Sequence, residues 1–380
     1  MPTSARIPDE SPRLEVHVFG SGKGESILVR LPGGEWGLVD HYASRPKDPT
    51  SSPAYMYLES QGVRTLEFVC LTHPHDDHYR GMGRILERFS PRQLWLFPVL
   101  DAATAKRLVE YLGLVELDSC NPQALADELA QILDWWNRRR SKARPNECRL
   151  RYVMLGKDLY PWPERQEASV RIRGLAPPDQ LAGRYTRDLL ACFRGDGNLR
   201  EKLPHRRHNV ISAALVIDWN STRILLGGDV EGEGWRLILE ECPDRLGSCS
   251  LVKVSHHGST NGYCAGLWQR LGDPMKTVAV LTPYHNHELP DPDALNFIEN
   301  HVSSLCATAP PGKTAGQFLP TDAPLESRQA LRGELHITPA STVERFGRCS
   351  FVFDDQGRCL SRQIISPAWS RTNQEALGGP

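Results

Sequence analysis

The donor-rich run at residues 73–78 is the segment whose side chains could most directly do chemistry. It reads His73-Pro74-His75-Asp76-Asp77-His78 and follows a strongly apolar stretch, 65–71, that predicts a buried strand. A loop leaving that strand can bring these nitrogen and oxygen donors around one point. They suit zinc, manganese or iron, and the run has no cysteine that would indicate a thiolate site. The alternative is a histidine-rich surface loop, which is disfavoured because the donors are dense and directly follow an apolar strand.

The spacing His73-x-His75-x-Asp77-His78 resembles the H-x-H-x-D-H signature of the metallo-β-lactamase superfamily. The resemblance implies an α/β fold, the αββα sandwich of two mixed β-sheets with helices outside. It also implies two divalent metal ions, Zn²⁺ or Mn²⁺, as cofactors. Two such ions that share a hydroxide lower its pKa and can stabilise an anionic transition state.

Later segments match the same family pattern in the same order. Asp40 ends a predicted strand and matches the aspartate that orients the metal loop. His208, four residues before Ser212, matches the histidine of the third motif, and Asp229 matches the bridging carboxylate. Alone, Asp229 or His208 would more commonly be a turn residue or a hydrogen-bonded histidine. Their order after the histidine run reverses that judgement.

The resemblance therefore assigns ligands to two ions. One ion takes His73, His75 and His208, the other takes Asp77, His78 and His256, and Asp229 bridges them. The last motif, His256-His257-Gly258-Ser259, follows a predicted strand, and the alternation of that strand favours His256 as the ligand. His257 could then lie behind the ligands, or donate to a leaving group or phosphate. We expect Asp77, Asp229 and His257 to be the catalytic residues.

Finer motifs resemble one branch of the superfamily, the metallohydrolase domain of ComEC-type DNA-uptake channels. They are the glycine-rich turn at 18–26, the segment 253–259 and a late loop at 282–290, and they imply that Ser259 and His287 contact substrate. This branch is associated with nuclease activity. The likeness covers 14–98 and 168–360 and lacks the membrane helices of the channel, so a free-standing soluble form is expected.

Two basic stretches could hold the phosphates of a nucleic acid. The first, 138–151, follows Trp135 and Trp136, whose rings could stack on bases or pack in the core. It could equally be a solvated helix end. The second, 194–207, leads directly to the third-motif histidine, so we favour it and expect Arg206 and Arg207 to bind substrate.

Hydrophobic periodicity predicts that the donors lie at strand ends. We expect a single domain over 14–365, a helical insertion at about 101–165, and loose tails at 1–13 and 366–380. Predicted strands lie at 14–19, 26–31, 36–40, 65–71, 93–97, 168–175, 210–218, 223–226, 251–255, 277–281, 333–337, 350–353 and 359–364. Predicted helices lie at 55–61, 81–89, 102–112, 122–140, 232–241, 264–271 and 292–300. Strands divided by helices without strict alternation fit two mixed sheets with outer helices.

Composition limits the remaining choices. The 380 residues are 40% hydrophobic and carry a formal net charge of -1, so any attraction to nucleic acid must come from local patches. No apolar stretch is long enough to span a bilayer and no signal peptide is visible, so we expect a cytoplasmic protein without a membrane partner. The 10 scattered cysteines are expected to be reduced thiols.

Three functions are weighed. The leading one is a metal-dependent phosphodiesterase, most readily a nuclease acting on DNA or RNA, similar to effectors of bacterial anti-phage defence that a regulatory protein partner controls. The second is hydrolysis of a small molecule, such as a cyclic nucleotide, lactone or thioester, under a helical cap. The third is a catalytically idle fold kept as a regulatory subunit, against which the complete ligand set argues.

Overall fold

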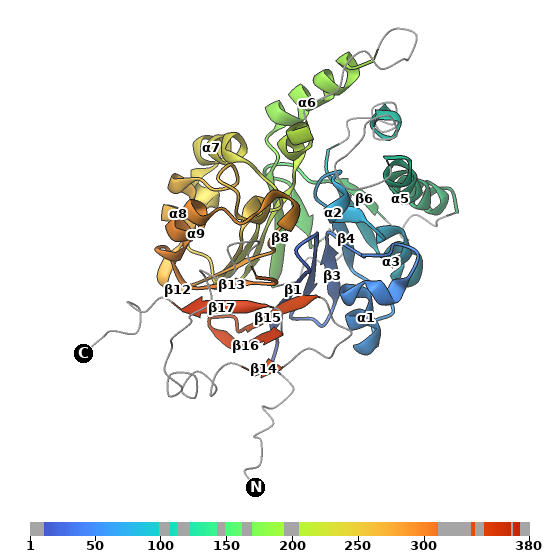
Figure 1. Cartoon of the computed structure of the whole chain (residues 1–380). Helices are drawn as coiled ribbons and strands as arrows, with labels where there is room; N and C mark the ends of the chain where they lie inside the picture. Colours follow the sequence, from blue (N-terminus) through green and yellow to red (C-terminus); the bar gives the residue numbers. More distant parts are fainter. Residues whose placement is uncertain are drawn as a thin grey trace, which may run out of the picture.

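Two β-sheets packed face to face form the centre of the molecule, with helices on both outer sides (Figure 1). The structure is a computed structural model that describes residues 11–98, 107–111, 122–142, 149–161, 169–193, 205–310, 336–338, 346–365 and 368–372. The expected α/β sandwich with an αββα layer order is confirmed. No helix in these ranges is long and apolar enough to cross a membrane.

The first sheet combines an antiparallel half with a parallel half. Its described strands are, in order across the sheet, β14 (His336–Thr338), β16 (Cys359–Ile365), β15 (Gly347–Phe353), β1 (Leu14–Gly20), β2 (Glu25–Arg30), β3 (Trp36–Val39), β4 (Phe68–Leu71), β5 (Gln93–Leu96) and β6 (Arg149–Tyr152). Strands β3 to β6 run parallel to one another. Their carboxyl ends therefore lie along one edge of the sheet.

The second sheet has the same mixed character. Its described strands are, in order, β17 (Trp369–Thr372), β13 (Val302–Ala307), β12 (Asp273–Leu281), β11 (Leu251–Lys253), β10 (Thr222–Leu226), β9 (Ala214–Trp219), β8 (Val170–Ala176) and β7 (Asp158–Tyr160). Strands β10 to β13 are parallel, so the loops that follow them also leave from one edge. These two loop edges carry the donor residues of both sheets.

The helices cover the outer faces. They are α1 (Pro53–Ser60), α2 (Asp76–Tyr79), α3 (Met82–Phe89), α5 (Pro122–Lys142), α6 (Asp179–Ala191), α7 (Gly232–Glu241), α8 (Ala265–Leu271) and α9 (Pro292–Glu299). Short 3-10 turns at η1 (Pro49–Ser51), η3 (His205–Ile211), η4 (Pro243–Arg245), η5 (Ser255–Gly258) and η6 (His285–His287) complete the described elements. In α3, the buried residues Met82, Ile85, Leu86 and Phe89 follow helical spacing and face the first sheet.

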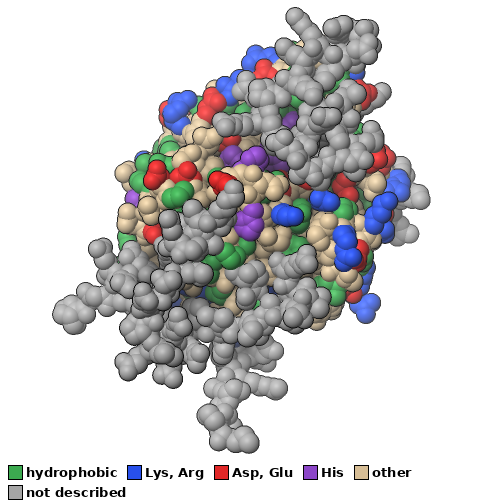
Figure 2. Space-filling model, in the orientation of Figure 1, with side chains coloured by type: hydrophobic (Ala, Val, Ile, Leu, Met, Phe, Trp, Pro, Cys, Tyr) green, Lys and Arg blue, Asp and Glu red, His purple; other side chains and the backbone are tan. Residues whose placement is uncertain are grey.

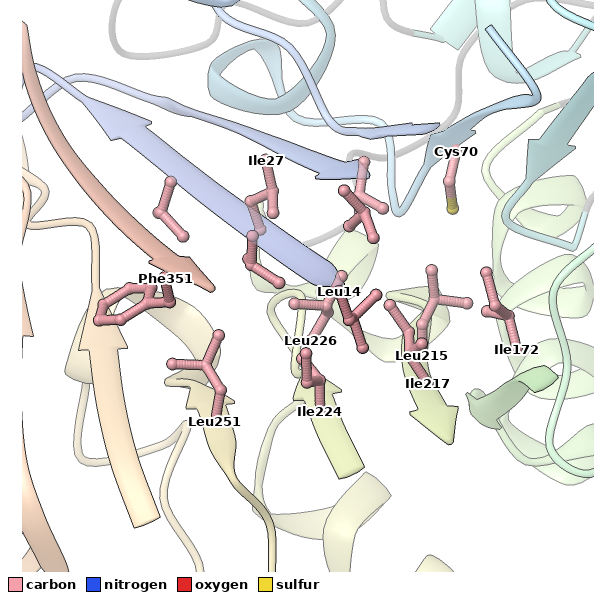
Figure 3. Close-up of a cluster of buried hydrophobic side chains, with 14 of the residues drawn as sticks. Leu14, Ile27, Cys70, Ile172, Leu215, Ile217, Ile224, Leu226, Leu251 and Phe351 are labelled. Atoms are coloured by element: carbon pink, nitrogen blue, oxygen red, sulfur yellow. The ribbon is translucent and has the colours of Figure 1, made fainter. Parts of the chain in front are cut away.

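Three hydrophobic cores hold the layers together. The central one lies between the sheets and joins side chains such as Ile27 and Cys70 of the first sheet to Leu215 and Leu251 of the second (Figure 3). A second core packs α1, α3 and α5 on the first sheet, and a third packs α7, α8 and α9 on the second. The sheets are thus buried on both faces, which explains why their strands are so apolar.

The expected helical insertion at 101–165 differs from the structure in two respects. Helix α5 is present, but β6 extends the first sheet and β7 pairs with β8 in the second. Trp135 of α5 is buried in the core beside the first sheet, so its ring is packed and cannot stack on a base. The side chains of Trp136, Arg139 and Arg140 lie outside the described residues.

The expected loose tail at 366–380 contains a strand. Residues Trp369–Thr372 form β17 and pair antiparallel with β13, and the indole Nε1 of Trp369 donates to the carbonyl of Ala309 at 3.0 Å. The tail expectation is therefore corrected for this segment. A four-residue edge strand is too short to show a clear alternation of polar and apolar residues.

Candidate metal centre

The donor-rich run leaves the first sheet at the end of β4 and turns into α2. His73 and His75 lie in the loop, while Asp77 and His78 occupy the first turn of α2, for which His75 is the N-cap residue. All four side chains are buried. The structure places these donors in two compact groups, and within each group the donor atoms lie within 4.8 Å of one another.

The first group consists of His73, His75 and Asp229. His73 Nε2 lies 3.0 Å from His75 Nδ1 and 3.7 Å from Asp229 Oδ2. Asp229 follows β10 in the second sheet, so the group joins donors from both sheets. Ligands around a tetrahedral zinc ion with bonds of roughly 2.0–2.1 Å are separated by roughly 3.3 Å. The observed distances are close to that value.

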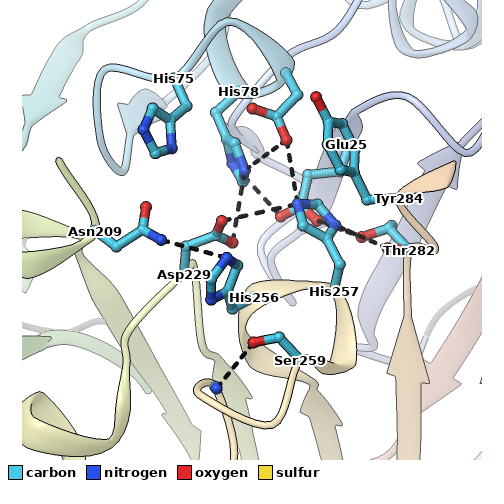
Figure 4. Close-up of polar contacts among 12 residues, drawn as sticks. Glu25, His75, His78, Asn209, Asp229, His256, His257, Ser259, Thr282 and Tyr284 are labelled. Atoms are coloured by element: carbon cyan, nitrogen blue, oxygen red, sulfur yellow. Dashed lines mark hydrogen bonds and ion pairs between the residues drawn. The ribbon is translucent and has the colours of Figure 1, made fainter. Parts of the chain in front are cut away.

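The second group consists of Asp77, His78 and His257. Asp77 Oδ2 lies 3.4 Å from His78 Nε2 and 3.1 Å from His257 Nε2. His257 follows β11, so this group also joins both sheets (Figure 4). Two nitrogen donors and a carboxylate are a ligand set that zinc and manganese accept.

Asp229 belongs to the first group and also faces the second. Its Oδ1 is 3.6 Å from His78 Nε2, while its Oδ2 is 3.7 Å from His73 Nε2 and 3.8 Å from His257 Nε2. Its backbone N–H donates to Ser212 Oγ at 2.8 Å, which holds the residue in place. The buried atoms His78 Nε2 and Asp229 Oδ1 have no hydrogen-bond partner in the described structure. Because unpartnered buried polar atoms are costly, these residues fit a site for cations.

The carboxylates and imidazoles of this cluster strongly shift one another's protonation. Burial disfavours the charged form of His78, but Asp77, Asp229 and Asp40 outweigh it and raise the pKa of His78 well above its ordinary value. Burial likewise opposes ionisation of Asp77 and Asp229, yet His78 and His257 hold the pKa of both carboxyls well below the usual range. The cluster therefore favours carboxylates facing positive charge, which a divalent cation would also supply.

Asp40 holds the donor run from behind, as its sequence position predicts. β3 and β4 are parallel with Val39 opposite Cys70, so Asp40 leaves the sheet beside Thr72. The buried Asp40 carboxylate accepts from Thr72 N at 2.8 Å and from Thr72 Oγ1 at 2.7 Å. His78 Nδ1 lies 2.7 Å from Asp40 Oδ2, and a histidine that donates there presents Nε2 to the centre.

The structure places His208 beside the first group, although not within it. His208 is buried on η3, and its ring centroid is 5.4 Å from that of His75. Its Nδ1 is 2.7 Å from the hydroxyl of Tyr185 on α6. The predicted helix list lacked α6, so sequence reasoning missed Tyr185. Its signal was present, because Leu181, Tyr185 and Leu189 recur every four positions.

For the last histidine, the geometry favours His257 over the predicted His256. β11 ends at Lys253, and both histidines have positive φ angles, 47° for His256 and 54° for His257. Strand alternation therefore does not extend to them. His257 turns inward to Asp77, whereas His256 Nε2 lies 3.3 Å from Asn209 Nδ2 and its Nδ1 lies 3.5 Å from Glu231 Oε1 (Figure 4). His256 thus borders the centre without joining either group.

The predicted substrate contacts are distributed around this centre. Ser259 is buried, and its Oγ accepts from Gly262 N at 3.0 Å, which closes a turn. His287 is exposed on η6 and stacks on Tyr284, whose ring in turn stacks on His257 at a centroid distance of 5.2 Å. The side chains of Arg206 and Arg207 lie outside the described residues, although their backbone belongs to η3.

On the face shown in Figure 2, histidine side chains gather near the middle, and Lys and Arg side chains lie to their right and along the upper edge. Beneath the site lies a buried ion pair that sequence reasoning missed. Glu25 begins β2 and Lys253 ends β11, and both side chains are fully buried. A lysine within an apolar strand is the signal that could have revealed them, since buried lysines are almost always paired.

Comparison with known proteins gives a family match for part of the chain. Residues 25–110 match the family model described as the metallo-beta-lactamase superfamily. No curated protein sequence matches the chain.

Similarities to solved structures are remote. Tm1679, described as a metal-dependent hydrolase of the beta-lactamase superfamily, has 15% identity and a TM-score of 0.40, with 76% of this chain and 93% of that chain covered. The Zn²⁺-bound PqqB from Methylobacterium extorquens has 12% identity and a TM-score of 0.30, with 61% and 59% covered. CmlA, described as a diiron beta-hydroxylase from Streptomyces venezuelae, has 13% identity and a TM-score of 0.30, with 65% and 35% covered. The chain therefore spans less than two thirds of the length of the latter two.

The matched segment contains the run 73–78, where the two donor groups begin, and the fold around it is the two-sheet sandwich that the run implies. The chain is thus similar to the metallo-β-lactamase superfamily over residues 25–110, and its two donor groups could hold divalent metal ions.

Proposed function

We propose that the chain is a metal-dependent phosphodiesterase that cleaves DNA or RNA. The observation that carries this proposal is the position of Asp229 between the two donor groups, which gives the site one shared carboxylate and two sets of ligands. Two bound divalent ions would activate water and offset charge on the attacking and leaving oxygens of a phosphodiester. His73, His75 and Asp229 would hold one ion, with His208 beside them, and Asp77, His78 and His257 would hold the other.

Residues around the ligands have separate roles in this proposal. Asp40 orients His78. Ser212 holds Asp229, because Ser212 Oγ accepts a hydrogen bond from the backbone N–H of Asp229. Tyr284 packs on the His257 ring. The exposed His287, stacked on Tyr284, extends the surface on which a nucleotide could rest. Resemblance of the segments 18–26, 253–259 and 282–290 to the ComEC-type domain supports a nucleic acid as the substrate.

The test compares single- and double-stranded DNA and RNA, each incubated with the protein and either Mn²⁺ or Zn²⁺. Asp77→Asn should lower cleavage by more than roughly 100-fold, which exceeds the usual effect of losing a partner behind a ligand. Asp76→Asn is the matched control, because Asp76 lies on the same helical turn but belongs to neither donor group. Its Oδ2 lies 3.9 Å from Arg80 Nη1. This variant should cleave like the unchanged protein.

Two results would count against the proposal. An absence of metal-dependent cleavage with every nucleic acid would refute it. Cleavage restricted to small cyclic or chromogenic diesters would instead indicate the small-molecule hydrolase weighed at the outset.

A further inference from the structure

A buried carboxylate with its own counter-ion lies behind the second donor group. Glu25 Oε2 is 2.5 Å from Lys253 Nζ, and both side chains have no exposed surface. Glu25 Oε1 lies 3.8 Å from His78 Nδ1, and Oε2 lies 3.8 Å from His257 Nδ1. Glu25, Asp40 and His78 are spaced as a third possible metal group, but the Lys253 ammonium already supplies a cation to Glu25.

Thr282 connects this carboxylate to His257. The loop after β12 brings Thr282 between them, and its hydroxyl donates to Glu25 Oε2. The hydrogen of that hydroxyl is therefore directed away from His257. His257 Nδ1 lies 2.8 Å from the Thr282 carbonyl oxygen and 3.1 Å from Thr282 Oγ1 (Figure 4). A carbonyl oxygen can only accept, so Nδ1 of His257 carries the hydrogen.

The consequence appears at the other ring nitrogen. With the hydrogen on Nδ1, the Nε2 lone pair of neutral His257 points toward Asp77 Oδ2, 3.1 Å away. Two acceptors at that distance repel each other unless a proton or a cation lies between them. The arrangement around Thr282 therefore prepares Nε2 as a ligand atom.

The same arrangement occurs once more on the opposite side of the site. Thr72 Oγ1 donates to Asp40 Oδ2, and His73 Nδ1 lies 2.9 Å from Thr72 Oγ1. Each threonine hydroxyl thus donates its hydrogen to a buried carboxylate and accepts a hydrogen bond from a histidine of one of the donor groups. The difference lies in charge compensation, because Asp40 also accepts a backbone N–H of Thr72 whereas Glu25 faces Lys253.

We propose that Glu25, Thr282 and Lys253 form a positioning unit that fixes the orientation and tautomer of His257 and so controls cation binding by Asp77, His78 and His257. Glu25 sets the hydroxyl direction of Thr282, Lys253 keeps Glu25 charged inside the protein, and Thr282 sets His257. This inference rests on the two-metal site of the proposed function. It concerns metal affinity and is independent of the identity of the substrate.

The experiment measures Zn²⁺ per chain by elemental analysis and the affinity of each Zn²⁺ by competition with a chelating dye. Thr282→Val removes the hydroxyl, Thr282→Ser keeps it, and Thr277→Val is the control. Thr277 is an equally buried threonine on β12, but its hydroxyl donates to the Cys249 carbonyl at 2.7 Å, away from the site. Unchanged protein, T282S and T277V should bind two ions. T282V should bind its weaker ion roughly 10- to 100-fold less tightly.

A paired substitution tests the rest of the unit. Glu25→Met with Lys253→Met removes both buried charges together, which avoids leaving either one alone, and it also removes the acceptor of the Thr282 hydroxyl. This double variant should also lose affinity for one ion and retain the other. Unchanged affinity for both ions in T282V and in the double variant would overturn the proposal.

A measurement on the unchanged protein covers the case in which T282V does not fold. Long-range ¹H–¹⁵N spectra of the zinc-loaded protein should show the His257 ring with its hydrogen on Nδ1, the signal being assigned by its loss in His257→Asn. A hydrogen on Nε2 would overturn the proposal, as would an unchanged protein that binds fewer than two ions. Two bound ions and the predicted losses without nucleic-acid cleavage would support this unit while refuting the nuclease function.

Discussion

At the scale of single residues, the ring nitrogen that faces away from the centre decides what each histidine can do. His78 Nδ1 lies against the Asp40 carboxylate, and His257 Nδ1 lies against the Thr282 carbonyl. Both histidines therefore present Nε2 to Asp77. His256 has no such arrangement, because its Nε2 faces Asn209 and its Nδ1 faces Glu231. Adjacent histidines in one motif are thus chemically distinct.

The contrast between these neighbours gives a direct prediction. His257→Asn should remove one bound metal ion per chain and lower metal-dependent activity by more than roughly 100-fold, because it deletes a donor of the second group. His256→Asn should keep both ions, because its ring belongs to neither group. Elemental analysis of the two purified variants measures this difference. Loss of an ion in His256→Asn alone would restore the ligand assignment that the strand alternation predicted.

The sequence identified most of the donors because their types and order are unusual. The donors of the run 73–78 are close together in the sequence, so one short loop is enough to bring them together. Asp229 could be predicted because it follows the end of a strand. The sequence could not show which of His256 and His257 faces the centre, because their directions depend on two successive residues with left-handed backbone angles. An alternation rule applies only while the backbone stays extended. Lys253 and Glu25 were missed because their pairing joins strands of different sheets.

At the scale of elements, the glycine-rich turn between β1 and β2 supports the late loop that carries Tyr284. The carbonyl of Gly22 accepts from His285 N at 2.8 Å, and a Cβ on Gly22 would lie 2.2 Å from the His285 ring. Gly22 also has φ of 84°, which favours glycine. The turn therefore positions a loop of the second sheet from the first sheet.

Two glycine substitutions separate these effects. Gly34→Ala, at φ of 90° with nothing within 4 Å of its Cβ, should cost about 1 kcal/mol of unfolding free energy through backbone strain alone. Gly22→Ala should cost about 1–3 kcal/mol more, because the His285 ring must move. Urea unfolding of both variants measures the difference. Equal costs would show that the turn does not support the late loop.

Element prediction succeeded where the apolar pattern was clear and failed where it was interrupted. The amphipathic α3 and the apolar β4 were predicted within a few residues of their observed bounds. Strands β6, β7 and β17 are about as short as β4, but charged or polar residues interrupt each of them, so no apolar pattern marks them as strands. Their strand character comes from pairing with a neighbouring strand, which is a property of the tertiary structure.

At the scale of the whole molecule, the site lies where the two sheets meet. The first sheet supplies the run 73–78 and Asp40, while the second supplies Asp229 and His257. The central core holds these two edges together and thereby sets the distances between their donors. Buried titratable groups are consequently packed into the interior of the fold, so its stability must depend on pH.

His41 provides the clearest part of that dependence. It lies beside Asp40 with Nδ1 3.0 Å from the Arg80 carbonyl and Nε2 2.7 Å from Ser52 Oγ, and burial lowers its pKa from 6.5 to about 4. Between these pH values the unfolded chain binds a proton that the folded chain does not. The contribution of His41 is therefore complete above pH 6.5 and is lost progressively as the pH falls to about 4.

The expected loss of unfolding free energy from His41 over this interval is roughly 3 kcal/mol. Burial also lowers the pKa of His17 and His73, which adds to the loss on acidification, whereas the raised pKa of His78 acts in the opposite direction. His41→Gln isolates the part due to His41, because glutamine takes up no proton in this range. Urea unfolding of both metal-free proteins from pH 7 to pH 4 should give a shallower decline for the variant. Parallel declines would show that His41 is protonated in the folded protein at its ordinary pKa, and that burial at this position is not what makes the fold sensitive to acid.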